Sequence, residues 1–334
     1  MKKILFLPML LIFVLAACGG SEEVVDYPVY EPVDYYESEE PEEISQEMNS
    51  TAAIHGLLSY VEHNGNRAYI FGSMHLGRPY FFPLADEVEQ ALRRADVFAF
   101  EFDLTELQDF AGMLEMAGYM MLPLGTTLAD VLPEDTFNHL LDVLETFPSV
   151  NYEEIAMFQP MVAATMITAT EIFPTMGIFQ EYSVDTYIMS IARELDRQII
   201  GLNPLAHEMQ LLHGAPIDVQ IAAIQDLTDR DTMIEAATEL GLVEAYFTQD
   251  MDALLALLRP YDPEPNAFAE YMIDVIIIQR SIEFAEEIHR LLTETTEPTV
   301  FFVTMGIGHM IGNDQGNVFV VLEDMGHTIT PLWE

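Results

Sequence analysis

Two apolar runs, one near each end of the chain, finish in the same pattern of glycine, two further residues and histidine. The first run, 69–71, leads into Gly72–His75, and the second, 300–305, leads into Gly306–His309. Apolar runs that end in glycine are typical of buried strands, and functional side chains are common where the strands of a sheet end. The two imidazoles can meet only if both strands lie side by side. We therefore predict one sheet built from both ends of the chain.

The residues around the first histidine predict further strands of this sheet. Asn64-Gly65, between the apolar runs 56–62 and 67–72, is a strong β-hairpin signal. Apolar residues at helical spacing over 83–94 are followed by a second buried strand, 97–103. A strand, a helix and a strand in succession form a βαβ unit, which calls for parallel pairing.

The middle of the chain is predicted to be mostly helical. Apolar residues at three- and four-residue intervals predict helices over 104–119, 134–147, 152–170, 184–196, 216–227, 230–240 and 267–292. A short strand, 198–202, interrupts them, and a helix at 316–325 and a strand at 327–332 close the chain. The predicted fold class is α/β: a mixed or parallel central sheet from both chain ends, with a large helical insert at about 104–297.

Residues 1–17 have the pattern of a lipoprotein signal peptide. The dipeptide Lys2-Lys3 precedes an apolar stretch, 4–15, that is too short to span a bilayer, and small residues precede Cys18. The tetrapeptide 15–18 resembles the bacterial lipobox, which implies cleavage before Cys18 and lipidation of that residue. An ordinary signal peptide is the alternative. Since Cys18 is the only cysteine, we expect no intramolecular disulfide and no thiol nucleophile.

The charge of the chain limits its partners. Its formal net charge is −44, and no lysine follows residue 3. Nucleic acid is not an expected partner, because a phosphate backbone needs a basic footprint. We expect the lipid on Cys18 to hold the protein at the membrane. The acidic, proline-punctuated segment 18–50 is predicted to be an extended tether, with a cation-collecting arm as the alternative, and the folded domain to span 52–334.

The two strand-end histidines and one acid would form a minimal metal centre. Imidazole and carboxylate suit divalent Zn, Mn, Fe or Co, and three protein ligands leave a position open for water. Glu101 is the best acid, because it stands inside a hydrophobic strand, where a charge is costly unless it is paired. Asp103 lies on the same side of that strand and is a candidate base. Alternatively, the histidines are hydrogen-bonded structural residues and Glu101 only contacts a helix N-terminus.

The remaining histidines are not expected to carry chemistry. His207 and His213 are six residues apart, which places them on different faces of a helix and excludes an H-E-x-x-H zinc helix. Five others lack an acidic or glycine-rich context and are expected to have surface or packing roles: His55, His63, His139, His289 and His327. The chain has no nucleophile elbow, P-loop or dinucleotide fingerprint, so serine-hydrolase and nucleotide chemistry are unsupported.

Several of these motifs together resemble those of one protein family. The segments 69–77, 83–84, 97–103, 306–312 and 326–329 are similar to the TraB/PrgY/GumN family, which includes the Tiki proteins. The resemblance covers about 52–332 and implies an α/β fold of the erythromycin esterase and ChaN type. It implies metal-dependent protease activity, as in the Tiki members, with Mn²⁺ or Co²⁺ as the favoured ion and Zn²⁺ or Fe²⁺ as alternatives. By position, it makes His75, His309 and Glu101 the metal and catalytic residues.

The chain also departs from the family pattern. Asn203 stands where a glutamate is common, Ser281 replaces an asparagine after Arg280, and Pro160-Met161 replaces Pro-Trp. Asp185 of Ser183-Val184-Asp185 matches the aspartate of a common Gly-Val-Asp and is expected to lie behind the ligands or contact substrate. The resemblance thus implies a retained metal centre with altered substrate selectivity or turnover.

These observations predict a lipid-anchored, extracytoplasmic, metal-dependent hydrolase that cleaves peptides. His75, His309 and Glu101 would hold the ion, and Glu101 or Asp103 would take a proton from a metal-activated water. Arg280 would steady a carboxylate or oxyanion, or else pair with acids on neighbouring helices. One alternative function is a non-catalytic surface protein that sequesters a peptide signal or metal compound. A purely structural surface lipoprotein is another.

Overall fold

A computed structural model of the protein describes residues 54–103, 110–248, 250, 253–254, 266–311 and 316–332. The predicted signal peptide and tether, 1–17 and 18–50, lie outside these residues. Six strands of the described chain form one mixed sheet in the order β4-β3-β5-β2-β1-β6. They are β1 (Ser59–His63), β2 (Asn66–Ser73), β3 (Val97–Phe102), β4 (Gln198–Asn203), β5 (Val300–Gly306) and β6 (Thr330–Pro331).

The two glycine–histidine strands lie next to each other, as predicted. β2 and β5 pair in parallel over seven positions, from Arg67 with Val300 to Ser73 with Gly306. β3 pairs in parallel with β5 and with β4, so the carboxyl ends of four strands meet at one edge of the sheet. The predicted βαβ unit is parallel, but its two strands are not neighbours, because β5 lies between β2 and β3.

The predicted hairpin is confirmed and joins β1 to β2. His63 pairs with Asn66, and the two residues between them have the positive φ angles, 49° at Asn64 and 91° at Gly65, that a tight hairpin turn needs. Asn66 is buried, and its amide donates to the carbonyl oxygens of Leu292 and Thr295. This side chain therefore fixes the hairpin to the end of a late helix.

Helices account for most of the remaining described residues. The α-helices are α1 (Asp86–Arg94), α2 (Phe110–Met120), α3 (Leu128–Val131), α4 (Glu134–Leu144), α5 (Tyr152–Ile155), α6 (Pro160–Ile167), α7 (Phe173–Thr175), α8 (Val184–Glu194), α9 (Leu205–His213), α10 (Ile217–Gln225), α11 (Arg230–Leu240), α12 (Leu242–Thr248), α14 (Ala267–Tyr271), α15 (Arg280–Glu294) and α16 (Val318–Asp324). Short 3₁₀ turns occupy η3 (Pro79–Phe81), η6 (Gln180–Tyr182) and η8 (Ile307–His309), and η5 (Thr168–Ile172) and η7 (Met272–Gln279) are π-helical. In the described part of the chain, no helix is long and apolar enough to cross a membrane.

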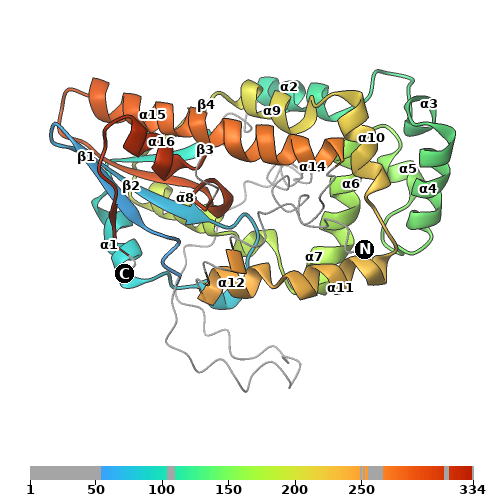
Figure 1. Ribbon diagram of the computed structural model, residues 1–334, viewed down its shortest axis with the longest axis horizontal. Coiled ribbons are helices and arrows are strands. Elements are labelled where there is room, and N and C mark those ends of the chain that lie inside the picture. Colours follow the sequence, from blue (N-terminus) through green and yellow to red (C-terminus); the bar gives the residue numbers. More distant parts are fainter. Residues whose placement is uncertain are drawn as a thin grey trace, which may run out of the picture.

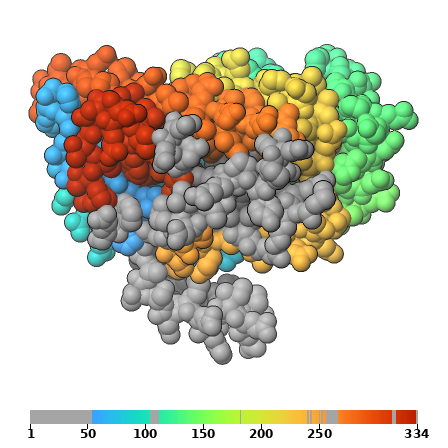
Figure 2. Space-filling model, in the orientation of Figure 1, coloured from blue at the N-terminus to red at the C-terminus, as the bar shows by residue number. Residues whose placement is uncertain are grey.

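The sheet and most of the helical insert occupy opposite ends of the molecule. Figure 1 shows the sheet at the left between α1 and the pair α15 and α16, while α3 to α6 and α10 gather at the right. The run from α14 into α15 passes from the helical end to the sheet. Figure 2 shows that early residues, in blue, adjoin the C-terminal residues, in red, as expected for a sheet built from both chain ends.

Three predicted elements are wrong in detail. The helix predicted at 152–170 is broken into α5 and α6, because Pro160 begins a new helix there. The helix predicted at 267–292 is continuous but contains the π-helical η7, which apolar spacing alone does not distinguish from α-helix. The closing strand, predicted at 327–332, is only the two-residue β6.

Candidate metal and catalytic centre

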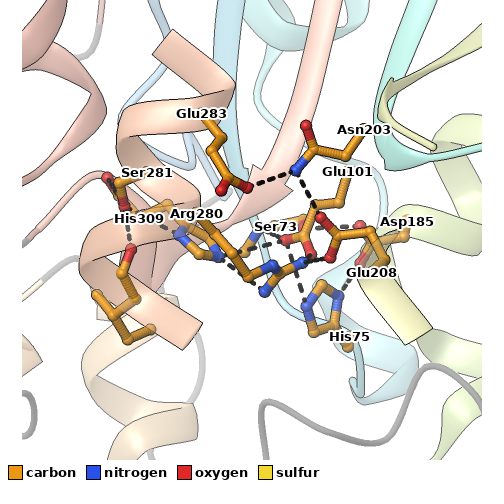
Figure 3. Close-up of polar contacts among 12 residues, drawn as sticks. Ser73, His75, Glu101, Asp185, Asn203, Glu208, Arg280, Ser281, Glu283 and His309 are labelled. Carbon is orange, nitrogen blue, oxygen red and sulfur yellow. Dashed lines mark hydrogen bonds and ion pairs between the residues drawn. The ribbon is translucent and has the colours of Figure 1, made fainter. Parts of the chain in front are cut away.

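The carboxyl ends of the four parallel strands bring together a buried group of ionisable side chains. His75 follows β2, Glu101 lies near the end of β3, Asn203 ends β4 and His309 follows β5. Helices α8, α9 and α15 add further polar residues to this group (Figure 3). A parallel sheet directs its strand ends to one edge, which is where such sheets commonly place their sites.

His75 is held by a carboxylate from the start of α8. Its Nδ1 lies 3.0 Å from Oδ2 of Asp185, and Oδ1 of the same carboxylate accepts a hydrogen bond of 2.8 Å from Ser73. The Nε2 atom of His75 then faces Oε1 of Glu101 at 3.7 Å. Burial lowers the pKa of His75, but Asp185 and Glu101 outweigh that effect and raise it above its ordinary value.

His309 is held in the corresponding way by a hydroxyl group. Ser281 donates its proton to the carbonyl oxygen of Ile277 at 2.6 Å, so its Oγ accepts from Nδ1 of His309 at 3.0 Å. In a neutral ring this leaves an unprotonated Nε2, which lies 3.8 Å from Oε1 of Glu101. Burial lowers the pKa of His309 to about 3, so the ring stays neutral.

Glu101 is the common partner of both imidazoles. Its Oε1 accepts from the backbone N–H of Gly306 at 2.7 Å, and its Oε2 lies 2.5 Å from Nη2 of Arg280. Burial raises the pKa of Glu101, but Arg280 and the two histidines outweigh it and hold that pKa well below its usual range. Glu101 is thus an ionised carboxylate in a buried position.

Arg280, the first residue of α15, bridges two buried acids. Its Nη2 lies 2.5 Å from Oε2 of Glu208 as well as from Glu101, and its Nη1 lies 3.4 Å from Nε2 of His309. Glu208 is completely buried in α9, and Arg280 is 2% exposed. Of the two interpretations of Arg280 from the sequence, the structure agrees with ion pairing to neighbouring acids.

A second set of contacts leads from this group toward the surface. Asn203 donates to Glu208 at 2.7 Å and to Glu283 at 3.1 Å. Glu283 also lies 2.9 Å from Nε2 of His207, whose side chain is 39% exposed. The amide at 203 therefore links two carboxylates, where a third carboxylate would be repelled.

The structure brings most of the predicted site residues together. His75, His309, Glu101, Asp185 and Arg280 share one buried centre (Figure 3). Asp103 lies just beyond the end of β3 and stays a candidate base, while Cys18 lies outside the described residues.

The sequence patterns did not indicate Glu208. One signal was available: Glu208 stands on the same helix face as Leu205, Met209 and Leu212, where an unpaired charge would be costly. An acid on an apolar helix face therefore points to a buried cation, which here is Arg280.

The donor atoms fit a divalent ion in kind and nearly in spacing. About 3.4 Å separates ligand atoms around a tetrahedral ion with bonds of about 2.1 Å, and the two Nε2 atoms stand 3.7 and 3.8 Å from Oε1 of Glu101. A Cβ at position 306 would lie 3.2 Å from Nε2 of His75 and 3.3 Å from Oε1 of Glu101, so Gly306 keeps this space open. As the described side chains stand, no three or more His, Cys, Asp or Glu residues are already arranged around an ion position.

Comparison with known proteins gives a consistent family match. The model of the TraB/PrgY/gumN family matches residues 57–331. Two relatives, the uncharacterized proteins YbaP of Shigella flexneri and of Escherichia coli K12, are each 22% identical over 262 residues, which cover 76% of this chain and 87% of theirs. No solved structure matches the chain significantly, so the expected likeness to the erythromycin esterase and ChaN type stays a prediction.

Proposed function

The chain belongs to the TraB/PrgY/gumN family, and from that premise we propose that it is a metal-dependent hydrolase of peptide bonds. Its ion would be held by His75, His309 and Glu101. Mn²⁺ and Co²⁺ are the favoured ions, as the resemblance to the Tiki proteins implies, with Zn²⁺ and Fe²⁺ as alternatives.

One observation carries this proposal: each imidazole is anchored through Nδ1 and turns Nε2 toward the same carboxylate oxygen. Asp185 anchors His75, and Ser281 anchors His309. Histidine ligands of metals usually donate their second N–H to such a carboxylate or oxygen, which fixes the ring and its tautomer. The two Nε2 atoms therefore face one shared carboxylate oxygen, the arrangement that a common ion would need.

The charges of the centre also favour a cation. Among the described residues, the buried carboxyl groups of Glu101 and Asp185 are paired with one permanent positive charge, that of Arg280, and with His75, whose pKa is raised. A divalent ion could replace the proton that His75 otherwise takes up. When bound, such an ion lowers the pKa of water and polarises a carbonyl group.

The residues of the chain have separate roles in this proposal. Asp185 and Ser281 orient the imidazoles, and Arg280 orients Glu101 through Oε2, which leaves Oε1 toward the histidines. Asp103 is the candidate to accept a proton from water, because Glu101 is already committed to Arg280 and Gly306. Burial of the centre limits bulk water and strengthens these interactions.

We further propose that the protein acts outside the cytoplasm, anchored by a lipid on Cys18. The signal-like segment 1–17 and the position of the only cysteine support this location. The tether 18–50 would let the domain reach peptides beyond the bilayer surface.

Metal content measured together with peptide cleavage tests the proposed activity. We expect the parent domain to hold an ion at this centre and to cleave a peptide library, and His75→Ala and His309→Ala each to bind about one ion fewer than the parent and to lose cleavage. His139→Ala is the matched control, because its Nε2 is bonded to the Leu227 carbonyl oxygen and not to the centre. A parent that neither binds an ion nor cleaves peptides would overturn the proposal.

A non-catalytic binding protein is the second candidate, and the position of Arg280 favours it. The guanidinium is paired with Glu101, so this carboxylate is not free to act as a base beside a bound ion. Ion binding without cleavage in the same experiment would select this function.

A further inference from the structure

Three histidines from distant parts of the sequence meet at the edge of the sheet opposite the candidate centre. His63 ends β1 and pairs with Asn66, the first residue of β2, whereas the candidate centre follows the last residue of β2. His289 lies in α15, and His327 follows α16. We call His63, His289 and His327 the histidine trio.

The ring of His327 lies against each of the other two rings of the trio. Nδ1 of His289 lies 2.8 Å from Nε2 of His327, and their ring centroids are 5.1 Å apart at an interplanar angle of 67°. The ring of His63 lies 5.8 Å from that of His327 at 78°. His327 is 8% exposed, and the other two rings are partly buried. His327 thus stands between two imidazoles.

We propose that the histidine trio is a binding site for a divalent transition-metal ion, with Zn²⁺ as the best-matched ion. Neutral imidazole is the ligand shared by Zn²⁺, Ni²⁺ and Cu²⁺, whereas Mg²⁺ and Ca²⁺ prefer oxygen ligands. Three imidazoles also leave a fourth position for water.

The ring spacing matches such a site. Imidazole centroids lie about 5.3 Å apart when two rings bind one tetrahedral ion with bonds of about 2.1 Å. The observed separations of 5.1 and 5.8 Å lie on either side of that value, and the steep ring angles allow lone pairs to converge. Stacked rings could not present their nitrogens in this way.

The present arrangement is the ion-free form of the proposed site. His289 and His327 share a hydrogen bond, so the trio as it stands is not already spread around an ion. To bind an ion, the ring that now donates this hydrogen bond must carry its proton on its other nitrogen. Nδ1 of His289 and Nε2 of His327 must also move apart by roughly half an ångström to reach the spacing of two ligand atoms. No proton has to leave the protein, because two neutral rings already have two lone pairs.

Two further features favour ligation. Gly326, at φ 88°, follows the C-cap of α16, and the backbone N–H of His327 bonds to the Leu322 carbonyl oxygen at 3.0 Å, which fixes the backbone from which the His327 ring projects. The net charge of −44 also raises the local concentration of cations.

The test must separate the histidine trio from the candidate centre. We would titrate Zn²⁺ by calorimetry into the metal-free full chain carrying His75→Ala and His309→Ala. We expect one site with a micromolar or tighter dissociation constant. Adding His63→Asn, His289→Asn or His327→Asn should weaken it at least tenfold, while His139→Asn should leave it unchanged.

Each outcome tests the proposed metal site at the histidine trio, whether or not the protein has the proposed hydrolase activity. Absence of Zn²⁺ binding in the double variant, or binding that no trio substitution weakens, overturns it. If the double variant does not fold, the parent chain is compared with His63→Asn, which should bind one equivalent of Zn²⁺ fewer. Circular dichroism of each variant, with and without Zn²⁺, provides a second readout, because an ion bound only to the folded state must raise the melting temperature.

Discussion

The Nδ1 atom of His75 lies 3.0 Å from Oδ2 of Asp185, and both side chains are buried at the junction of β2 and α8. The carboxylate also accepts the hydroxyl proton of Ser73, so both of its oxygens are bonded to the strand end. This pairing sets which nitrogen of His75 faces Glu101.

Replacing Asp185 with Asn should therefore weaken the proposed metal centre. An amide can offer Nδ1 only a weaker, neutral partner, and loss of such a partner typically costs 10- to 100-fold in metal affinity or activity. Metal titration of Asp185→Asn measures the effect. Ser73→Ala, which keeps the carboxylate on His75, should show a smaller loss, and equal losses in the two variants would contradict the assigned role of Asp185.

Replacing Arg280 with Gln should strongly destabilise the fold. Arg280 lies between Glu101 and Glu208, and its removal leaves two buried carboxylates without their cation. Breaking a buried ion pair from one side costs about 3–5 kcal/mol. Urea unfolding measures this against Arg290→Gln, whose exposed ion pairs should be worth less than about 1 kcal/mol. Similar free energies of unfolding in the two variants would mean that the buried charges are compensated in another way.

The local features of this fold are visible in the sequence because they depend on neighbouring residues. The positive φ angles of the hairpin follow from Asn64-Gly65, and both glycine–histidine strand ends were predicted from their apolar runs. The placement of β5 between β2 and β3 was not predicted, because strand order depends on packing between distant segments. The family match is confirmed, whereas the roles of the site residues stay predictions.

The sequence patterns did not indicate Glu208 or the histidine trio, because both depend on contacts between side chains that are far apart in the sequence. Glu208 joins the centre only because α9 packs beside β4 and α15 brings Arg280 to it. The histidine trio was expected to have surface or packing roles, since none of its members has a motif of its own. Each of these groups is assembled by tertiary structure, and its members are far apart in the chain.

A methyl group at position 306 should block the candidate centre without unfolding the protein. Gly306 has a φ angle of −54°, which alanine also adopts, but its Cβ would enter the space between Nε2 of His75 and Oε1 of Glu101. We expect Gly306→Ala to lower metal affinity at least tenfold and to change the melting temperature little. Gly118→Ala, where a Cβ meets no neighbour, should leave metal affinity unchanged. Unaltered ion binding in Gly306→Ala would place the ion elsewhere.

The stability of the fold should fall in mild acid because of His213 at the end of α9. Both ring nitrogens lack a hydrogen-bond partner among the described residues, and burial lowers the pKa of His213 to about 4. The unfolded chain, with an ordinary histidine pKa near 6.5, binds the proton more readily between these values. The free energy of unfolding therefore decreases as the pH falls from about 6.5 to about 4, and this residue contributes about 2 kcal/mol of that loss between pH 7 and pH 5.

His213→Leu isolates this contribution from those of the other titrating groups. Leucine fills a similar volume and has no nitrogens to leave unbonded, so at pH 7 the variant should be at least as stable as the parent. At pH 5 its stability relative to the parent should be about 2 kcal/mol greater than at pH 7, because its folded state no longer has to exclude a proton that the unfolded chain accepts. Urea unfolding of both proteins at the two pH values gives this difference directly. A difference that does not change with pH would show that His213 takes up a proton inside the folded protein.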